Sequence, residues 1–239
     1  MSPYEENVMH ELRLWQKKMM KSPSLLDILS KGTQNRINRI IPEKVHKAIT
    51  VGIRKMVQTV LFGSKYITPK PLGGVSLEIR EESIGRKIES YRNAAVTEGA
   101  VTGAGGILLG LADFPLLLTI KIKLLFDIAS LYGFNVKDYK ERLFILYVFQ
   151  LAFSSQQRRN EVYARIANWD SYIQELPPQV EEFDWRTFQQ EYRDYIDLAK
   201  MAQLVPVIGA VVGAIANYRL VNLLGNTSMN CYRMRLLRK

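Results

Sequence analysis

The chain has 239 residues, 47% of them hydrophobic, and its 33 Lys and Arg against 23 Asp and Glu give a formal net charge of +10. This length is sufficient for one large domain or two small ones to bury a core without disulfide or metal crosslinks. The single cysteine, Cys231, excludes an intramolecular disulfide and fits a reducing compartment.

The basic excess predicts an anionic partner, and nucleic acid and anionic lipid are the two obvious classes. The sequence contains no recognisable recognition helix, RNP-like strand or metal knuckle. Lipid headgroups require only basic residues beside apolar surface. The first 21 residues also lack the apolar segment of a secretory signal. We therefore expect a cytoplasmic protein, peripheral to the cytoplasmic membrane, with an anionic membrane surface as partner and no nucleic acid.

Helical rather than alternating periodicity along the chain predicts an all-α multi-helix bundle. In the first predicted helix the apolar positions recur at helical spacing: Val8, Leu12, Trp15 and Met19. Such a helix could lie in a membrane interface, but packing against the rest of the domain is the favoured interpretation. In the membrane interpretation the contact residues are Trp15, Lys17, Lys18 and Lys21.

After a short helix predicted from Ser22-Pro23 through Ile28, a longer helix is predicted to begin at Pro42 and end at Gly63. Its inward stripe consists of Ile49, Ile53, Met56 and Val60. The segment 63–74 contains three glycines and two prolines, which is typical of a linker. It predicts a division into an N-terminal helical section, residues 1–75, and a helical core, residues 76–239. Asp138 and Asp184 are predicted to cap the N-termini of two later helices.

Two apolar segments contain glycines at helical spacing: Gly99, Gly103, Gly106 and Gly110 in the first, and Gly209 and Gly213 in the second. Because glycine costs a helix about 1 kcal/mol relative to alanine, such a stripe requires a local reason. Close approach of two helices is that reason, and we expect the stripes to pack face to face at the centre of the bundle. A phosphate-binding loop is a weaker alternative, since neither glycine-loop motif is present.

Membrane insertion is an alternative for the apolar segments 99–112 and 201–218. A membrane-spanning helix requires about 20 predominantly apolar residues, and both segments are shorter or interrupted by polar residues. Buried core is therefore favoured, with a re-entrant hairpin as the main form of the alternative.

Polar residues flank the apolar segments and form a candidate cluster: Glu98, Asp113, Asn217, Arg219 and Asn222. A buried acid requires a donor, so Glu98 is expected to pair with Arg219. A structural role is favoured over proton transfer or headgroup binding. Asp113, with Pro115 after it, is predicted to cap a helix, and Lys123 and Asp127 are expected to pair at i, i+4.

Signatures of catalysis are mostly absent. His10-Glu11 does not continue into a zinc-protease motif, no Cys/His group with metal-binding spacing is present, and there is no G-x-S-x-G elbow. No catalytic residue, metal or cofactor is therefore predicted. The alternative to a non-enzymatic role is a lipid- or peptide-directed hydrolase that uses Glu98 and Asp113, on the weak signal of two carboxylates.

Several segments together resemble the EcsC family: 98–115, Leu131-Tyr132-Gly133-Phe134, Glu141-Arg142-Leu143-Phe144 and 206–232, followed by Arg233. The resemblance covers about Tyr91 to the C-terminus, and the first 75 residues carry no such signature. It implies a bacterial protein encoded with an ABC transporter, and hence a peripheral membrane or membrane-complex accessory role in which transporter subunits are candidate partners. It implies no established chemistry. Leu223-Leu224 departs from the acidic residue expected there, which weakens a metal-binding role.

Overall fold

The computed structural model describes residues 2–21, 43–62, 70–104, 106–154, 158–184, 186, 188 and 209–238. Side chains are described for these residues except 43–46, 48, 61, 62, 96–117, 209–214 and 216. In this described part of the chain the regular elements are helices, which confirms the predicted all-α fold class.

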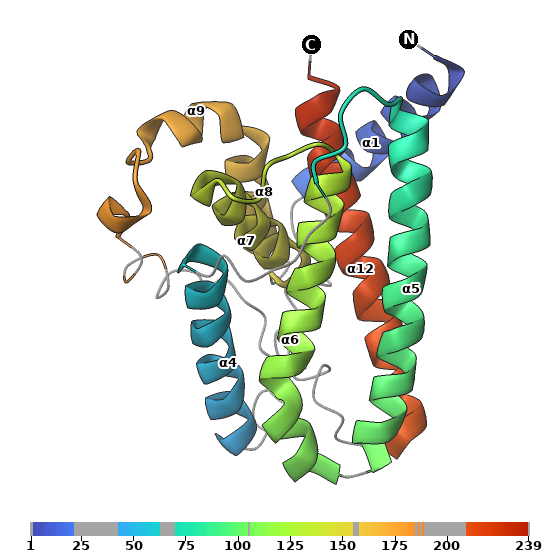
Figure 1. Cartoon of the computed structure of the whole chain (residues 1–239), viewed down its shortest axis with the longest axis vertical. Helices are drawn as coiled ribbons and strands as arrows, with labels where there is room; N and C mark the ends of the chain where they lie inside the picture. Colours follow the sequence, from blue (N-terminus) through green and yellow to red (C-terminus); the bar gives the residue numbers. More distant parts are fainter. Residues whose placement is uncertain are drawn as a thin grey trace.

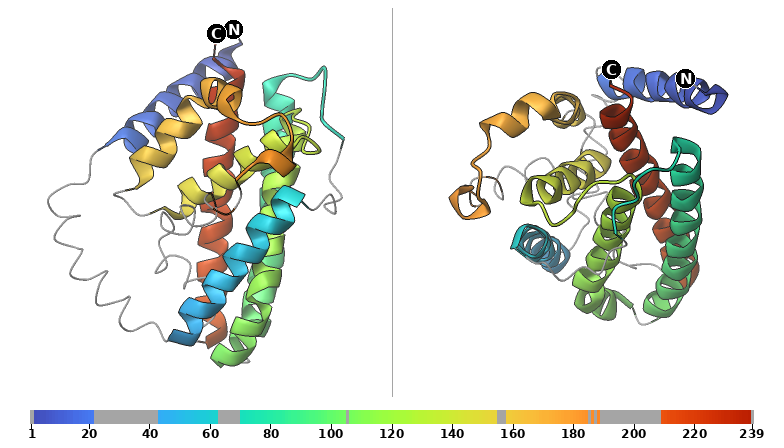
Figure 2. Two further views of the ribbon diagram at one scale, coloured as in Figure 1. Left: turned by 90° about the vertical axis from the view of Figure 1, so that its left-hand side faces the viewer. Right: turned by 45° about the horizontal axis from the view of Figure 1, so that its top comes forward.

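Three long helices lie side by side and form the frame of the molecule (Figures 1 and 2): α5 (Leu77–Ala104), α6 (Gly106–Leu131) and α12 (Gly209–Leu236). Helix α5 runs antiparallel to the other two, and its contact with α12 is the most extensive between any two described helices. The end of α5 and the beginnings of α6 and α12 lie together at one end of the frame. The chain termini lie at the opposite end.

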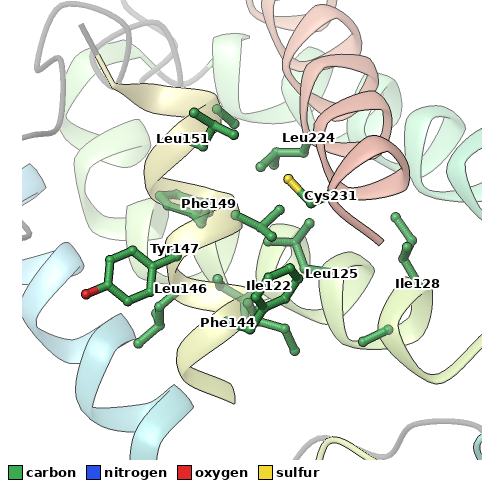
Figure 3. Close-up of a cluster of buried hydrophobic side chains, with 14 of the residues drawn as sticks. Ile122, Leu125, Ile128, Phe144, Leu146, Tyr147, Phe149, Leu151, Leu224 and Cys231 are labelled. Carbon is green, nitrogen blue, oxygen red and sulfur yellow. The ribbon is translucent and has the colours of Figure 1, made fainter. Parts of the chain in front are cut away.

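Helix α7 (Tyr139–Phe153) occupies the hydrophobic core, with 13 of its 15 residues buried. Its sequence is apolar on all sides, and a helix of that kind is stable only when other elements surround it. Figure 3 shows its side chains meeting those of α6 and α12. The Asp138 side chain accepts a hydrogen bond from the Lys140 backbone N–H at 2.9 Å, which confirms the predicted cap of α7.

Helix α4 (Glu43–Phe62) packs against α6 and α7 and agrees closely with the helix predicted from Pro42 to Gly63. The short helix predicted before it lies outside the described residues. The four residues of its predicted inward stripe are buried: Ile49, Ile53, Met56 and Val60. Burial of these side chains removes a continuous apolar stripe from water, which is the main source of stability for such a helix.

Helix α1 (Pro3–Met20) packs on α8 (Arg159–Ala167), α12 and α5 near the chain termini. A capping box between Ser2 and Glu5 fixes its first turn. Its predicted apolar side is turned inward, with Val8, Leu12 and Met19 buried. The core thus includes residues of α1 and α4 together with those after residue 75. Helix α9 (Trp169–Glu175) and the 3-10 turn η1 (Val180–Glu182) complete the described fold.

The first glycine segment does not form a face of one helix, contrary to the prediction. Gly99 and Gly103 belong to the last turns of α5, whereas Gly106 and Gly110 belong to the first turns of α6. Glycine weakens a helix because it costs more conformational entropy than other residues, and here the glycine-rich run coincides with a reversal between two helices. Gly209 and Gly213 belong to the first turns of α12. The predicted face-to-face contact of the two segments lies outside the described side chains.

The prediction that Asp113 caps a helix is wrong, because α6 continues from Gly106 through Pro115 to Leu131. Proline inside a helix lacks a backbone donor and costs about 3 kcal/mol, which is why the sequence suggested a break. Helix α6 contacts α4, α5, α7 and α12. Packing against four helices outweighs the local preference for a break. The predicted cap at Asp184 concerns a helix that lies almost wholly outside the described residues.

The close approach of α5 and α12 that the structure does describe occurs at Gly225, which sequence reasoning missed. A Cβ atom at this position would lie 2.6 Å from Ile88 Cδ1 and 2.9 Å from Ile88 Cγ1. At Gly85, on α5, an added Cβ would meet no atom within 4 Å. The absence of a side chain at Gly225 therefore lets Ile88 pack against the α12 backbone.

We expect Gly225→Leu to lower the free energy of unfolding by about 1 to 3 kcal/mol, because the new side chain overpacks the contact with Ile88. Gly85→Leu is the matched control, and we expect a gain of up to about 1 kcal/mol there from helix propensity alone. Urea unfolding followed by circular dichroism measures both. Equal stability of the two variants would contradict the close contact.

Candidate functional site

Of the predicted polar cluster, the structure describes the side chains of Asn217, Arg219 and Asn222, all on α12. Asn217 is buried, and its Oδ1 accepts a hydrogen bond from Lys121 Nζ at 3.1 Å. Arg219 is exposed, and Asn222 is half-buried. Asn217 and Arg219 are two positions apart on α12 and therefore point to different sides of the helix.

The side chains of Glu98 and Asp113 are not among the described side chains. The pairing of Glu98 with Arg219 therefore stays a prediction. The predicted ion pair between Lys123 and Asp127 is confirmed. The Asp127 carboxylate is fully buried and also accepts a hydrogen bond from the Tyr91 hydroxyl at 2.9 Å. Lys87 Nζ lies 3.6 Å from the same carboxylate, so Asp127 joins α5 to α6.

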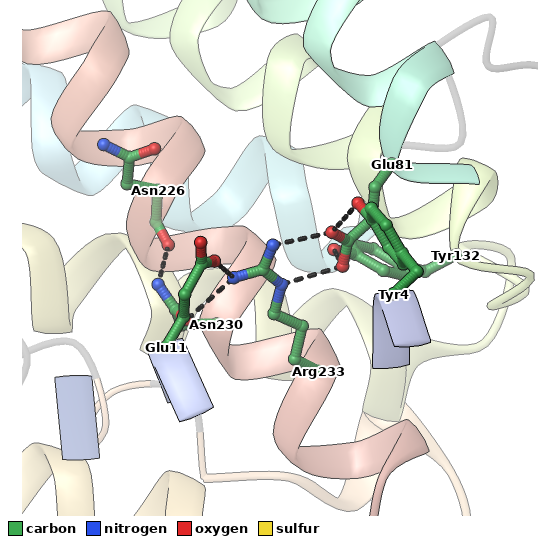
Figure 4. A network of polar contacts seen from close by, with 7 residues as sticks. All are labelled: Tyr4, Glu11, Glu81, Tyr132, Asn226, Asn230 and Arg233. Atoms are coloured by element: carbon green, nitrogen blue, oxygen red, sulfur yellow. Dashed lines mark hydrogen bonds and ion pairs between the residues drawn. The ribbon is translucent and has the colours of Figure 1, made fainter. Parts of the chain in front are cut away.

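A buried ion pair between Glu81 and Arg233 joins the beginning of α5 to the end of α12 (Figure 4). Arg233 Nε and Nη2 donate to the two carboxylate oxygens at 2.7 and 2.6 Å. The Arg233 side chain is 9% exposed and the Glu81 side chain is 2% exposed. This bidentate geometry is the strongest form of the arginine–carboxylate contact.

Tyrosines from two further helices donate to the same carboxylate. The Tyr132 hydroxyl, at the end of α6, lies 2.9 Å from Glu81 Oε1, and the Tyr4 hydroxyl of α1 lies 2.7 Å from Oε2. Arg233 Nη1 donates to Glu11 Oε2 of α1 at 3.1 Å. Figure 4 shows the guanidinium group between the two glutamates. One ion pair thus fixes the position of α1 on the bundle.

A second buried carboxylate, Glu141 at the start of α7, binds Arg235 of α12. Arg235 Nη1 lies 2.8 and 3.0 Å from its two oxygens, and the Tyr232 hydroxyl donates to Oε1 at 2.7 Å. The guanidinium group lies over the rings of Phe134 and Phe144, with centroid distances of 3.9 and 4.4 Å. Aromatic faces stabilise the arginine charge in this partly desolvated position.

Stacked tyrosine rings connect the two carboxylate sites. The rings of Tyr132 and Tyr232 lie 5.4 Å apart at an interplanar angle of 24°. Each ring directs its hydroxyl to a different glutamate. The ends of α6 and α12 and the beginnings of α5 and α7 therefore form one continuous polar and aromatic network.

Burial and neighbouring charges fix the protonation of most of this network. Burial and then the charge of Glu81 raise the pKa of Tyr132 well above its usual value, and burial and Glu141 do the same for Tyr232. Burial alone would lower the pKa of Arg233, but the Glu81 carboxylate outweighs it and the pKa is raised. Burial raises the pKa of Glu141, and this effect is larger than the lowering by Arg235 and Tyr232. The two tyrosine hydroxyls therefore stay protonated and can donate to the carboxylates.

The outer face of α1 carries the predicted membrane-contact lysines. Lys17, Lys18 and Lys21 are exposed, and each lies three, four or seven residues after Leu14, which is 54% exposed. These spacings place Leu14, Lys17 and Lys18 on one side of the helix, and Lys21 follows its last residue, Met20. Trp15, which is next to Leu14 in sequence, is half-buried, and its ring packs edge-on against Tyr163 at 5.8 Å. Sequence reasoning thus found the lysines but missed Leu14 as their apolar neighbour.

The EcsC protein family model matches residues 6–237 of this chain. The chain belongs to the EcsC family. It is 45% identical over 233 residues to Protein EcsC of Bacillus subtilis (strain 168), which covers 97% of this chain and 96% of that protein. It is 28% identical over 247 residues to Uncharacterized protein YdbA of the same organism, covering 94% and 90% of the two chains. No solved structure matches.

This match extends the family to the N-terminal section, which sequence reasoning had left outside the resemblance. The reason is visible in α1, where Tyr4 and Glu11 bind Glu81 and Arg233 directly. Three sequence segments that carry the EcsC resemblance also meet in the network, through Tyr132, Glu141 and Tyr232-Arg233. Their separation along the chain hid this convergence.

The two buried carboxylates are engaged by arginine and tyrosine donors, so the network holds helices together and offers no ionised group to a substrate. Within the described ranges, no three His, Cys, Asp or Glu side chains are grouped so as to hold a metal ion. None of the helices, as far as they are described, is long and apolar enough to cross a membrane.

We expect Glu81→Gln and Arg233→Met each to lower the free energy of unfolding by about 3 to 5 kcal/mol, because each leaves a buried charge without its partner. The double variant should lose less than the sum of the two. Denaturant unfolding measures all three. Arg86→Met is the control, since its pair with Glu82 is exposed and contributes at most about 0.5 kcal/mol. Additive losses would contradict direct coupling.

The raised pKa of Glu141 predicts a specific pH dependence of stability. The folded protein holds this proton more tightly than the unfolded chain, whose ordinary pKa is 4.5. The group therefore contributes stability below that pH, and the contribution is lost as pH rises through the folded pKa. As the pH rises from 4.5 to neutrality, the unfolding free energy of Glu141→Gln should therefore increase relative to that of the parent protein. A constant difference over this range would show that Glu141 is ionised throughout.

Proposed function

We propose that this EcsC-family protein acts as a peripheral protein at the anionic surface of the cytoplasmic membrane, as an accessory of a membrane complex. The outer face of α1 carries this proposal. Lys17, Lys18 and Lys21 surround the exposed Leu14, and no described residue forms an ion pair with any of the three. Basic side chains beside an apolar one are the combination that anionic lipid surfaces attract.

The buried side of the same helix supports this function in a second way. Tyr4 and Glu11 fix α1 to the core through the Glu81–Arg233 pair, and Arg159 and Asn160 of α8 contact the carbonyls of its last turn. The lysines are therefore presented from a rigid support. A membrane-binding face that is ordered in advance loses little side-chain and backbone entropy on binding.

The accessory part of the proposal rests on the family. EcsC resemblance implies an ABC transporter as context, and transporter subunits are the candidate partners at the membrane. The network itself engages its carboxylates internally, which favours a binding role over bond-making chemistry.

The test is flotation with vesicles of phosphatidylcholine and phosphatidylglycerol. Lys17→Gln/Lys18→Gln/Lys21→Gln should weaken binding by about 3 kcal/mol, since each basic residue at such a surface contributes about 1 kcal/mol. Higher salt should weaken parent binding as well. Folding should be unaffected because all three side chains are exposed.

The charge-matched control is Lys47→Gln/Arg54→Gln/Lys55→Gln, which removes three exposed basic residues of α4. It should retain most of the binding. Equal loss in both triple variants would show that net charge, rather than the face of α1, attracts the membrane. No binding of the parent protein to anionic vesicles would overturn the proposal.

A further inference from the structure

An open hollow of about 640 Å³ lies between the segment before α5 and the loop that joins α6 to α7. Its volume is within the range of roughly 300 to 1,000 Å³ that small-molecule sites occupy. It is lined by Lys70, Pro71, Ser130, Gly133, Asn135, Val136 and Lys137. This set contains two cationic groups, a hydroxyl and an amide, and no carboxylate.

The hydroxyl of Ser130 in this hollow has no hydrogen-bond partner within the described part of the chain. The residue is fully buried. A helical serine commonly donates to a carbonyl one turn earlier, as Ser154 does to the carbonyl of Leu151 at 3.0 Å. This oxygen has no accessible surface, so it lies behind the lining of the hollow and is not a donor to a ligand there.

The carbonyl groups at the end of α6 accept backbone hydrogen bonds, which reduces the negative charge that they present to an anion. The carbonyls of Ile128 and Ala129 accept from the N–H groups of Tyr132 and Phe134, both at 3.0 Å. The Ser130 carbonyl accepts from both Leu72 and Gly133 at 2.9 Å. The negative end of the helix is thus occupied by backbone donors.

Glycine is required in the wall of the hollow at position 133. Its φ of +95° belongs to the left-handed region, and an added Cβ would lie 2.6 Å from Arg80 Nη1 and 2.9 Å from the Leu72 carbonyl. Arg80 in turn donates to the Tyr132 carbonyl. The guanidinium group therefore lies directly behind the wall and adds positive charge to it.

Other side chains around the loop reinforce this charge. Arg142 Nη1 donates to the Lys137 carbonyl at 2.6 Å. Lys70 and Lys137 are exposed at the rim, and neither has a described carboxylate within ion-pair distance. Asn135 accepts from the Lys137 N–H through Oδ1, which leaves its Nδ2 group as a further donor. Asp138, the nearest acid in sequence, caps α7.

We propose that this hollow binds a phosphomonoester group, with Lys70, Lys137 and Asn135 as its donors. A phosphomonoester supplies several strong acceptor oxygens and close to two negative charges at neutral pH, which matches a set of donors without a carboxylate. The lining excludes a divalent metal ion, which would require oxygen ligands with negative charge. The phosphomonoester could belong to a soluble phosphorylated metabolite or to a lipid headgroup. The proposed site is separate from the outer face of α1 and does not rest on the function proposed for that face.

The experiment titrates the full-length protein with glycerol 3-phosphate and records backbone amide shifts by NMR, with glycerol as the uncharged control. Shifts should concentrate at Gly133, Asn135 and Lys137. Lys70→Gln/Lys137→Gln should weaken binding about tenfold or more, since each removes a charge-assisted hydrogen bond. Arg54→Gln/Lys55→Gln on α4 removes the same charge elsewhere and should leave binding unchanged.

Vesicles containing phosphatidate form the second arm, with phosphatidylcholine vesicles as control. Binding that depends on Lys70 and Lys137 but not on the lysines of α1, without binding of glycerol 3-phosphate, would identify a lipid headgroup as the source. The proposed site would be overturned if neither glycerol 3-phosphate nor phosphatidate vesicles bind, or if Lys70→Gln/Lys137→Gln binds with the same affinity as the parent protein. Tighter binding of a single-stranded oligonucleotide at the same residues would also overturn it, because phosphodiesters would then be the ligand.

Discussion

The ion pair between Glu81 and Arg233 is the constraint on which the arrangement of the chain ends depends. Two charges removed from water must be paired and fully hydrogen-bonded, or the folded state loses several kcal/mol. Here the remaining oxygens and N–H groups are satisfied by Tyr4, Tyr132 and Glu11. The beginning of α5, the end of α6, the last turns of α12 and α1 must therefore be in place together.

The last turns of α12 have a central position because Arg233 and Arg235 point to different sides of the helix. Arg233 binds α5 and α1, whereas Arg235 binds Glu141 at the start of α7. A single helix end thus joins the outer helices to the buried one. The stacked rings of Tyr132 and Tyr232 fill the space between the two ion pairs and exclude water from both.

Local patterns predicted the parts of the fold that local physics decides. The inward stripe of α4, the cap at Asp138 and the i, i+4 pair of Lys123 with Asp127 each depend on neighbours within a few residues. Glu81 and Arg233 are 152 positions apart, and no spacing in the sequence connects them. A signal was nevertheless present, since charged and tyrosine residues recur inside the apolar segments that carry the EcsC resemblance.

The two wrong expectations have opposite physical causes. Pro115 costs a helix about 3 kcal/mol, but α6 continues through it because its packing against four helices outweighs that cost. In 99–110 the glycines were expected on one helix face, whereas the glycine-rich run, which has low helix propensity, coincides with the reversal between α5 and α6.

The two sides of α1 show how structure and function are divided in this protein. The inner side contributes Tyr4, Glu11 and three buried apolar residues to the core, so changes there alter folding. The outer lysines form no described ion pair and contribute nothing to the core. A surface whose charges are not needed for stability is free to be selected for binding, because its residues can change without unfolding the protein. The same reasoning holds for Lys70 and Lys137, which are exposed at the rim of a hollow whose floor and wall are set by the end of α6.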